Sequence, residues 1–171
     1  METDGAREKV REMAKQINSF ARTLFERDGS HVALAMFLDK DAKVIPPPMM
    51  LAALDCAGSE YRRRVFSAAV KAGVLACVTV AEAWLRAGGF DDHTMKQLLH
   101  GEMRISDLNE NDRTEALVVT AVMRDGFSVL ITNAVDRSSG RAELKEACLV
   151  EAGPEDGGIG MGGRLADVWK G

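Results

Sequence analysis

The sequence predicts an α+β domain, with a mostly antiparallel sheet of about five to six strands and helices packed on one face. Three observations lead to this fold class. Near the start of the chain, apolar residues recur every three or four positions, as on one face of a helix. A run in the middle is apolar on both alternating faces. Two further strand-like runs are joined through Asp125-Gly126, and this order of helices and strands is typical of an α+β domain.

The composition is that of one globular domain. The chain has 171 residues, of which 46 % are hydrophobic and 28 % are charged, and this balance argues against disorder or a fibrous repeat. The formal net charge is -4 and the pI is near 5.4. Because the chain has no global positive field, nucleic acid and anionic membranes are disfavoured as partners.

Several features favour the cytoplasm. Met1 is followed by acidic and small residues, without the basic and apolar regions of a secretory signal. The longest nearly uncharged apolar run, residues 74–85, contains Glu82 and is shorter than the roughly 20 residues of a membrane helix. The cysteines are odd in number and widely spaced, so they indicate neither a disulfide framework nor a zinc site: Cys56, Cys77 and Cys148.

The N-terminal third of the chain is predicted to form a helix followed by two strands. The helix covers about residues 5–27, and Asp28-Gly29 ends it because glycine accepts the left-handed conformation of a helix terminus. Residues 31–38 are apolar on both faces and predict a strand, and residues 43–45 predict a short second strand. Pro46 to Pro48 then stop the sheet pairing, because proline has no N–H group to donate.

The middle of the chain predicts two more helices around a central strand. Residues 59–72 form a helix that begins at a capping serine. Residues 74–83 are apolar on both faces, as expected of a central strand that is covered on two sides. Residues 91–100 predict a short helix with two aspartates at its start, and residues 104–113 predict a polar connection.

The clearest local signal is a hairpin. Residues 115–123 and 127–135 are strand-like, and Asp125-Gly126 between them suits a two-residue type I′ turn. This turn places Val122 opposite Val129 and leaves largely apolar side chains on both faces of the ribbon. We expect one face to pack on helices, and the other face then needs cover from another segment.

The end of the chain is predicted to be an arm and not a phosphate-binding site. A last strand over residues 142–150 completes a single domain of residues 1–152, and residues 153–171 form a Gly-rich C-terminal arm. Gly158, Gly160 and Gly163 spell G-x-G-x-x-G, the pattern of a dinucleotide-binding turn. No strand leads directly into these glycines, and the eight residues after them are too few for a helix and a returning strand. We therefore expect no cofactor.

The arm has the features of a docking segment. Leu165, Val168 and Trp169 follow the spacing of one apolar helical face at the end of a flexible glycine tether. This short turn is expected to dock on its own sheet or on that of a neighbour. Together with one face of the hairpin it predicts a homodimer or a protein partner, with these interaction residues: Leu117, Val119, Leu130, Leu165, Val168 and Trp169.

Four residues are candidate catalytic groups: Glu82, His93, His100 and Glu102. Glu82 closes an apolar strand, where burial would raise the pKa of its carboxyl group and suit it to acid–base chemistry. The alternative is a glutamate that faces water at the end of a strand. His93 and His100 are seven residues apart, about 10.5 Å along a helix, which is too far for one ion. We expect no metal site there and interpret the pair as a solvated polar face.

A cluster of three arginines is the only concentrated positive patch. Arg62, Arg63 and Arg64 lie beside Tyr61 and Phe66, an arrangement that suits a phosphate group or an RNA strand. The alternative is a solvated side of a helix in an acidic protein. We favour this alternative because nothing nearby in the sequence reinforces the patch, and nucleic acid is not an expected partner.

Two functional hypotheses follow from the sequence. The first is a small cytoplasmic, non-catalytic protein that associates with itself or with a protein partner through its sheet and its C-terminal arm. The second is an enzyme or a small-ligand-binding protein with a pocket between helices and sheet near Glu82, His93 and His100. No Gly-x-Ser-x-Gly motif or neighbouring Cys and His pair supports the second hypothesis.

Overall fold

The computed structural model describes residues 2–86, 107–109 and 112–154. This part of the chain contains three helices and a seven-stranded sheet. In chain order the elements are α1 (Glu2–Asp28), β1 (Leu34–Leu38), β2 (Val44–Met50), α2 (Leu51–Cys56), α3 (Gly58–Lys71), β3 (Ala76–Arg86), β4 (Arg113–Met123), β5 (Ser128–Asp136), β6 (Glu143–Leu144) and β7 (Cys148–Ala152). The predicted helix over residues 91–100 lies outside the described residues.

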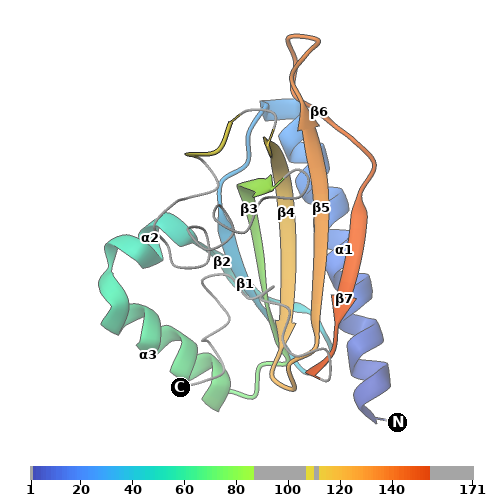
Figure 1. Cartoon of the computed structure of the whole chain (residues 1–171). Helices are drawn as coiled ribbons and strands as arrows, with labels where there is room; N and C mark the ends of the chain where they lie inside the picture. The colour runs from blue at the N-terminus through green and yellow to red at the C-terminus, as the bar shows by residue number, and fades with distance from the viewer. Residues whose placement is uncertain (1, 87–106, 110–111, 155–171) are drawn as a thin grey trace.

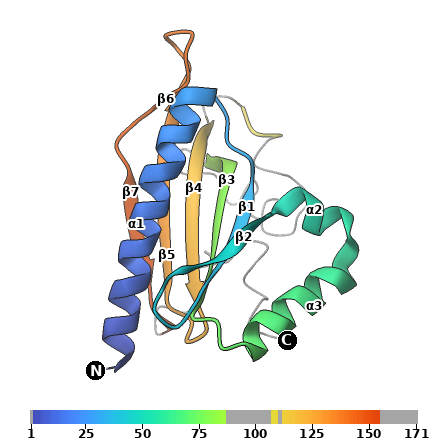
Figure 2. The same cartoon turned by 180° about the vertical axis from the view of Figure 1, so that it is seen from behind.

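All the strand pairs are antiparallel. The order across the sheet is β2-β1-β3-β4-β5-β6, and β7 also pairs with β5. β6 and β7 lie end to end along the same side of β5, because β6 pairs with residues 135–136 and β7 with residues 128–132. α1 runs across one face of the sheet, over β3, β4 and β5 (Figure 1, Figure 2). The predicted α+β fold class with a mostly antiparallel sheet is therefore confirmed.

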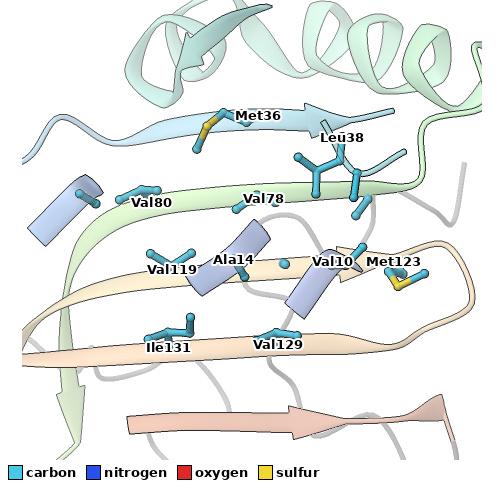
Figure 3. Close-up of a cluster of buried hydrophobic side chains, with 14 of the residues drawn as sticks. Val10, Ala14, Met36, Leu38, Val78, Val80, Val119, Met123, Val129 and Ile131 are labelled. Atoms are coloured by element: carbon cyan, nitrogen blue, oxygen red, sulfur yellow. The ribbon is translucent and has the colours of Figure 1, made fainter. Parts of the chain in front are cut away.

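The main core lies between α1 and this face of the sheet. Val10, Ala14, Ala21 and Phe25 are buried on α1 and share one side of the helix, as their three-and-four spacing requires. The central strands contribute alternate residues, which point to the same face, and Figure 3 shows these side chains beside α1: Met36, Leu38, Val78, Val80, Val119, Met123, Val129 and Ile131. Each fully buried aliphatic side chain contributes about 1.5–3 kcal/mol, so this layer is the main source of stability.

The predicted end of the first helix is confirmed. α1 ends at Asp28, and Gly29 follows with a φ of 74°. The N–H group of Gly29 donates to the carbonyl of Phe25 at 2.7 Å. A residue with a side chain would be strained in this left-handed conformation, and this is the physical reason for the glycine at this position.

The prediction that Pro46 to Pro48 stop the sheet pairing is wrong. β2 runs through the prolines to Met50, pairing Ile45 with Phe37 before them and Met49 with Ala35 after them. The register shifts in between, so that the three prolines lie opposite the single residue Met36. Proline is tolerated here because β2 is an edge strand and the bulge removes the need for ladder donors.

The predicted register of the hairpin is wrong by one residue. Val122 pairs with Ser128 and Val129 pairs with Ala121, because the connection has three residues and not two. The N–H group of Met123 donates to the carbonyl of Phe127 at 2.8 Å, and the N–H group of Gly126 donates to the carbonyl of Met123 at 3.1 Å. With a φ of 92°, Gly126 takes the left-handed position of a three-residue hairpin loop.

The last predicted strand, over residues 142–150, is divided in two. β6 and β7 are separated by residues 145–147, where the N–H group of Lys145 still donates to the carbonyl of Ala134 at 2.9 Å. A second difference is α2, a six-residue helix directly after β2 that the sequence analysis did not predict. Both are short elements, which local sequence patterns define poorly because tertiary contacts decide them.

α3 packs on the opposite face of the sheet from α1, which we call the second face. The helices therefore lie on both faces of the sheet and not on one face, as the sequence predicted, because neighbouring residues of β3 point to opposite faces and both faces are apolar. Phe66 of α3 is buried against Cys77 of β3, with Phe37 of β1 partly buried beside them. The rings of Phe37 and Phe66 meet edge to face, with centroids 5.9 Å apart and planes at 85°, a favoured geometry for an aromatic pair. This small cluster holds the α2–α3 unit at the β1–β2 side of the sheet (Figure 1).

Candidate functional site

Glu82 lies at the end of the sheet beyond the C-terminus of α1. Its side chain is exposed, and one carboxylate oxygen accepts the backbone N–H group of His31 in the loop before β1. The bond ties this loop to β3 and gives the carboxylate a structural partner. Of the two sequence interpretations, the structure agrees with a glutamate that faces water.

Glu115 and Arg137 form the dominant ion pair at the same end of the sheet. Two guanidinium nitrogens of Arg137 donate to the two carboxylate oxygens of Glu115, at 2.8 and 2.6 Å. The hydrogen bond from Arg137 holds the pKa of the Glu115 carboxyl below its usual value. The guanidinium of Arg113 stacks on the ring of Trp84, 4.3 Å from its centroid. These contacts tie the end of β3 and the segment after β5 to the start of β4.

The structure does not describe the other three candidate catalytic residues. His93, His100 and Glu102 lie outside the described residues, so a site that combines them with Glu82 stays a prediction. Among the residues that are described, no group of three or more His, Cys, Asp and Glu side chains is arranged to hold a metal ion.

A buried polar network crosses the interface between α1 and β5. The amides of Asn18 and Asn133 bond each other in both directions, at 2.7 and 3.3 Å. The side-chain nitrogen of Asn133 also donates to the carbonyl of Leu117 at 3.0 Å, and Arg22 donates to the Asn133 oxygen at 2.7 Å. Buried amides of this kind stabilise a fold only when they are satisfied, and here they fix the position of α1 along β5.

The sequence analysis missed this network, although a signal was present. Asn18 interrupts the apolar side of the predicted helix, and Asn133 is a polar residue in a largely apolar strand of the predicted hairpin, one face of which is expected to pack on helices. Two polar residues on two faces that must meet are candidates for a mutual hydrogen bond.

Further polar contacts fasten α1 to β6 and β7. Arg22 donates to the carbonyls of Lys145 and Leu144, at 2.7 and 3.2 Å. Arg11 forms a two-pronged ion pair with Glu151 of β7, of which one contact is 2.8 Å, and the hydrogen bond from Arg11 lowers the pKa of the Glu151 carboxyl. The outermost strands on this side are therefore anchored through α1 as well as through β5.

A shallow hollow of about 460 Å³ lies beside the N-terminal half of α1 and the β4–β5 turn. Arg7 at its rim donates to Asp125 at 3.0 Å and lies over the ring of Phe127, 5.3 Å from the centroid. Arg11 is held by Glu151 and also contacts Glu8. Because both arginines are engaged by carboxylates, the hollow presents no concentrated positive charge to a ligand.

The outer side of β7 forms one edge of the described sheet, and we call it the β7 edge (Cys148–Ala152). β7 pairs with β5 on its inner side, and none of the described strands pairs with its outer side. Leu149 is 36 % exposed and Val150 is 43 % exposed, and they point to opposite faces because side chains alternate along a strand. An open edge with exposed apolar side chains is a template for another strand.

The structure separates the residues that the sequence analysis grouped as an interaction surface. Leu117 and Val119 are 0 % exposed in the core beneath α1, whereas Leu130 points to the second face. The corrected register explains the difference, because Leu117 and Val119 pair with Asn133 and Ile131 while Leu130 pairs with Thr120. Leu165, Val168 and Trp169 lie outside the described residues.

The arginine cluster lies on α3, the second helix of the α2–α3 unit. Arg64 pairs with Glu60 one helical turn earlier, and Tyr61 is exposed. Phe66, which the RNA interpretation would have used for base stacking, is buried against Cys77. This arrangement supports the interpretation as a solvated side of a helix.

Comparison with known protein families shows that the chain is similar to a phage protein family. A family model described as bacteriophage lambda protein ea47 matches residues 1–156. No curated protein matches the chain, and no solved structure matches it. None of the helices in the described part of the chain is both long enough and apolar enough to cross a membrane.

Proposed function

We propose that this chain, which belongs to the family of bacteriophage lambda protein ea47, is a non-catalytic protein-interaction module that binds through its β7 edge. The observation that carries the proposal is the outer side of β7, which pairs with none of the described strands and exposes Leu149 and Val150 at the middle of the strand. Backbone groups on such an edge supply affinity to an added strand, and the alternating side chains supply specificity.

The charged clusters support a binding role over a catalytic one. Glu115 is held by Arg137, Glu151 by Arg11 and Asp125 by Arg7. These ion pairs fasten strands, turns and α1 to one another, so their carboxylates are engaged in maintaining the fold. A rigid sheet anchored in this way presents its free edge in a fixed conformation, which lowers the entropic cost of binding.

The C-terminal arm belongs to the same proposal. The chain leaves β7 at Ala152, so the arm begins at one end of the proposed binding edge. Leu165, Val168 and Trp169 then contribute apolar contacts to the bound partner from the end of a glycine tether. We place the module in the cytoplasm, because Cys56, Cys77 and Cys148 are free thiols and a reducing compartment keeps thiols in that state.

The test is the solution mass of the full chain by size-exclusion chromatography with light scattering. We expect a species heavier than the monomer that Val150→Lys converts to monomer, because a lysine on the strand replaces an apolar contact with a charge. Ile45→Lys is the matched control, since Ile45 is 40 % exposed on the opposite edge, and it should leave the mass unchanged. Trp169→Ala should weaken the association without abolishing it.

Two outcomes would contradict the proposal. One is a full chain that remains a monomer across the concentration range and that captures no protein partner through β7. The other is an assembly that survives Val150→Lys and is lost with Ile45→Lys, which would assign the interaction to the other edge.

A further inference from the structure

We propose that the partner of the β7 edge is a second copy of this chain, bound strand to strand about a two-fold axis with Val150 opposite Val150. The inference rests on the proposed function, because it names the partner of the same edge. Two antiparallel β7 strands would join the two sheets into one continuous sheet across the dimer.

The hydrogen bonds of the hairpin determine which residues of β7 direct their backbone N–H and C=O groups toward β5 and which direct them outward. The bond from the N–H group of Met123 to the carbonyl of Phe127 sets the alternation along β5, in which even-numbered residues turn their backbone groups toward β7. Their partners in the ladder are Cys148, Val150 and Ala152. The backbone groups of Leu149 and Glu151 therefore point outward, away from β5.

With a two-fold axis at Val150, all the outward N–H and C=O groups of Leu149 and Glu151 can form hydrogen bonds with the second copy. This axis places Leu149 of each copy opposite Glu151 of the other copy. The dimer therefore contains two equivalent pairs of residues whose outward N–H and C=O groups bond each other. All five residues of β7 then have a partner. If the register between the two β7 strands is shifted by two residues, the dimer is still symmetric, but one end of each β7 strand has no partner.

The side chains of β7 fit a second copy. Glu151 is the only charged side chain of the strand, and its ion pair with Arg11 neutralises it within its own subunit. Two copies therefore meet without facing unpaired like charges, which would disfavour the contact. The exposed Val150 side chains of the two copies meet at a non-hydrogen-bonded position, where cross-strand side chains are closest.

The opposite edge of the sheet limits the assembly to two copies. β2 carries Pro46, Pro47 and Pro48, which have no N–H groups for a further strand. Pairing at β7 is therefore isologous and closed. Five residue pairs bury less than the roughly 1,200–2,000 Å² of a standard interface, so we expect a dimer that dissociates on dilution.

Disulfide trapping in the full-length protein tests the register. Val150→Cys is introduced with Cys56→Ser and Cys148→Ser, and the protein is incubated with a mixture of reduced and oxidised glutathione. At a non-hydrogen-bonded pair the Cα atoms lie about 4.5 Å apart, within the range that a disulfide spans. The two thiols lose their protons and two electrons to glutathione disulfide, and a covalent dimer forms.

The controls separate this pairing from chance collisions. Ile45→Cys in the same background has similar exposure on the blocked edge and should form the covalent dimer about tenfold more slowly. Leu149→Pro removes an outward N–H group while leaving the inward ladder of β7 intact. Symmetry doubles the loss to two hydrogen bonds, so we expect the dimer to bind about thirtyfold more weakly, with an unchanged far-ultraviolet circular dichroism spectrum.

Each contrary result has a separate meaning. If light scattering shows a dimer but Val150→Cys traps no faster than Ile45→Cys, the strand pairing is wrong while the interaction module stands. Faster trapping of the native Cys148 than of Val150→Cys would overturn the Val150 register in favour of a shifted one. A full-length protein that stays monomeric yet binds another protein through β7 would overturn the inference alone, and a monomer that binds nothing would overturn both proposals.

Discussion

The two edges of the sheet both expose apolar side chains, but they differ in proline content and in the regularity of their strand pairing. The β2 edge carries three prolines within a seven-residue strand, and a bulge shifts its register against β1. The β7 edge has no proline, exposes Leu149 and Val150, and is held in place by the ion pair between Arg11 and Glu151. Prolines and bulges are common devices for protecting an edge. Among the described strands, the β2 edge is therefore protected against further pairing and the β7 edge is not.

The helices reinforce this difference. α1 is attached to β5 through buried amides and to the end of β6 through arginine contacts with backbone carbonyls. The α2–α3 unit is attached on the β1–β2 side through an aromatic contact and a buried cysteine. Directional polar contacts fix a strand in one position, whereas a small apolar cluster tolerates more adjustment. The β7 side is therefore the more rigidly anchored side of the sheet.

The largest expected effect comes from cutting the polar anchor on the β7 side. Asn133→Ala removes the partner of Asn18 and one acceptor of Arg22, and it leaves the carbonyl of Leu117 without its side-chain donor. Because each buried group left unsatisfied costs about 1–3 kcal/mol, we expect the free energy of unfolding in urea to fall by about 4 kcal/mol. Thr132→Ala, next in sequence on the second face, is the control and should cost less than about 1 kcal/mol. Equal losses for the two variants would show that the amide network is not an anchor.

The second prediction concerns the anchor of the α2–α3 unit. Phe66→Ala should lower the free energy of unfolding by about 3 kcal/mol, at the low end for a buried phenylalanine because the cluster around it is small. Hydrogen exchange should accelerate first in α3 and leave the amides of β4 and β5 protected. The exposed Tyr61 on the same helix gives the control, since Tyr61→Ala should change stability by no more than about 0.5 kcal/mol. Uniform acceleration over the whole sheet would argue against a separable unit.

Acid should weaken both anchored ends of the sheet. Arg11 and Arg137 hold the pKa values of Glu151 and Glu115 below the ordinary value of 4.5. Each ion pair therefore contributes stability above the unfolded pKa, and this contribution is lost as the pH falls below about 4.5 through the lower folded pKa. The partners are partly exposed, so each pair contributes up to about 1 kcal/mol at neutral pH.

Urea unfolding at several pH values checks this dependence. The fall in stability between pH 6 and pH 3 should be smaller in Glu151→Gln and in Glu115→Gln than in the unmodified protein, because the titrating carboxyl is gone. An identical pH dependence in all three proteins would show that neither ion pair contributes.

The smallest expected effect concerns the chemical reactivity of two cysteine thiols. Burial raises the pKa of the Cys77 thiol to about 12, whereas Cys148 is exposed on the β7 edge. Iodoacetamide should label Cys148 in the native protein and spare Cys77, because the thiolate is the reactive form. Labelling of Cys148 should slow as protein concentration rises, since dimerisation covers the edge, while Phe66→Ala should expose Cys77. Rapid labelling of Cys77 in the unmodified protein would place it outside the cluster with Phe66.

Elements could be predicted from the sequence where the local pattern and the burial of the element agreed. The helix up to Asp28 with its terminal glycine, the central strand and the two strands of the hairpin follow from periodicity, because a continuous face must be buried. The predictions were wrong where the structure of a segment depended on a neighbouring strand. Pro46 to Pro48 are compatible with a strand at the sheet edge, and one extra residue in the turn at Asp125 moved Leu130 to the opposite face.

The candidate site shows the same division. The sequence marked Glu82, but its role depended on the loop that brings the N–H group of His31 to it. Leu117 and Val119 were expected at a surface and lie in the core, since register decides which residues of a two-sided apolar strand face the helix. The β7 edge carried no recognisable signal, because a short apolar strand looks the same at an edge and in the middle of a sheet.

By itself, the sequence determined the fold class and the longer elements, namely α1, α3, β3, β4 and β5, because hydrophobic periodicity over a long segment is a local property that distinguishes a helix from a strand. The tertiary structure alone decided the strand order, the hairpin register and the pairing of Asn18 with Asn133. It also decided the contrast between the proline-rich edge at β2 and the edge at β7, with which no further described strand pairs. These features depend on which strands become neighbours. That choice is made by contacts between residues far apart in the chain, and no local pattern encodes it.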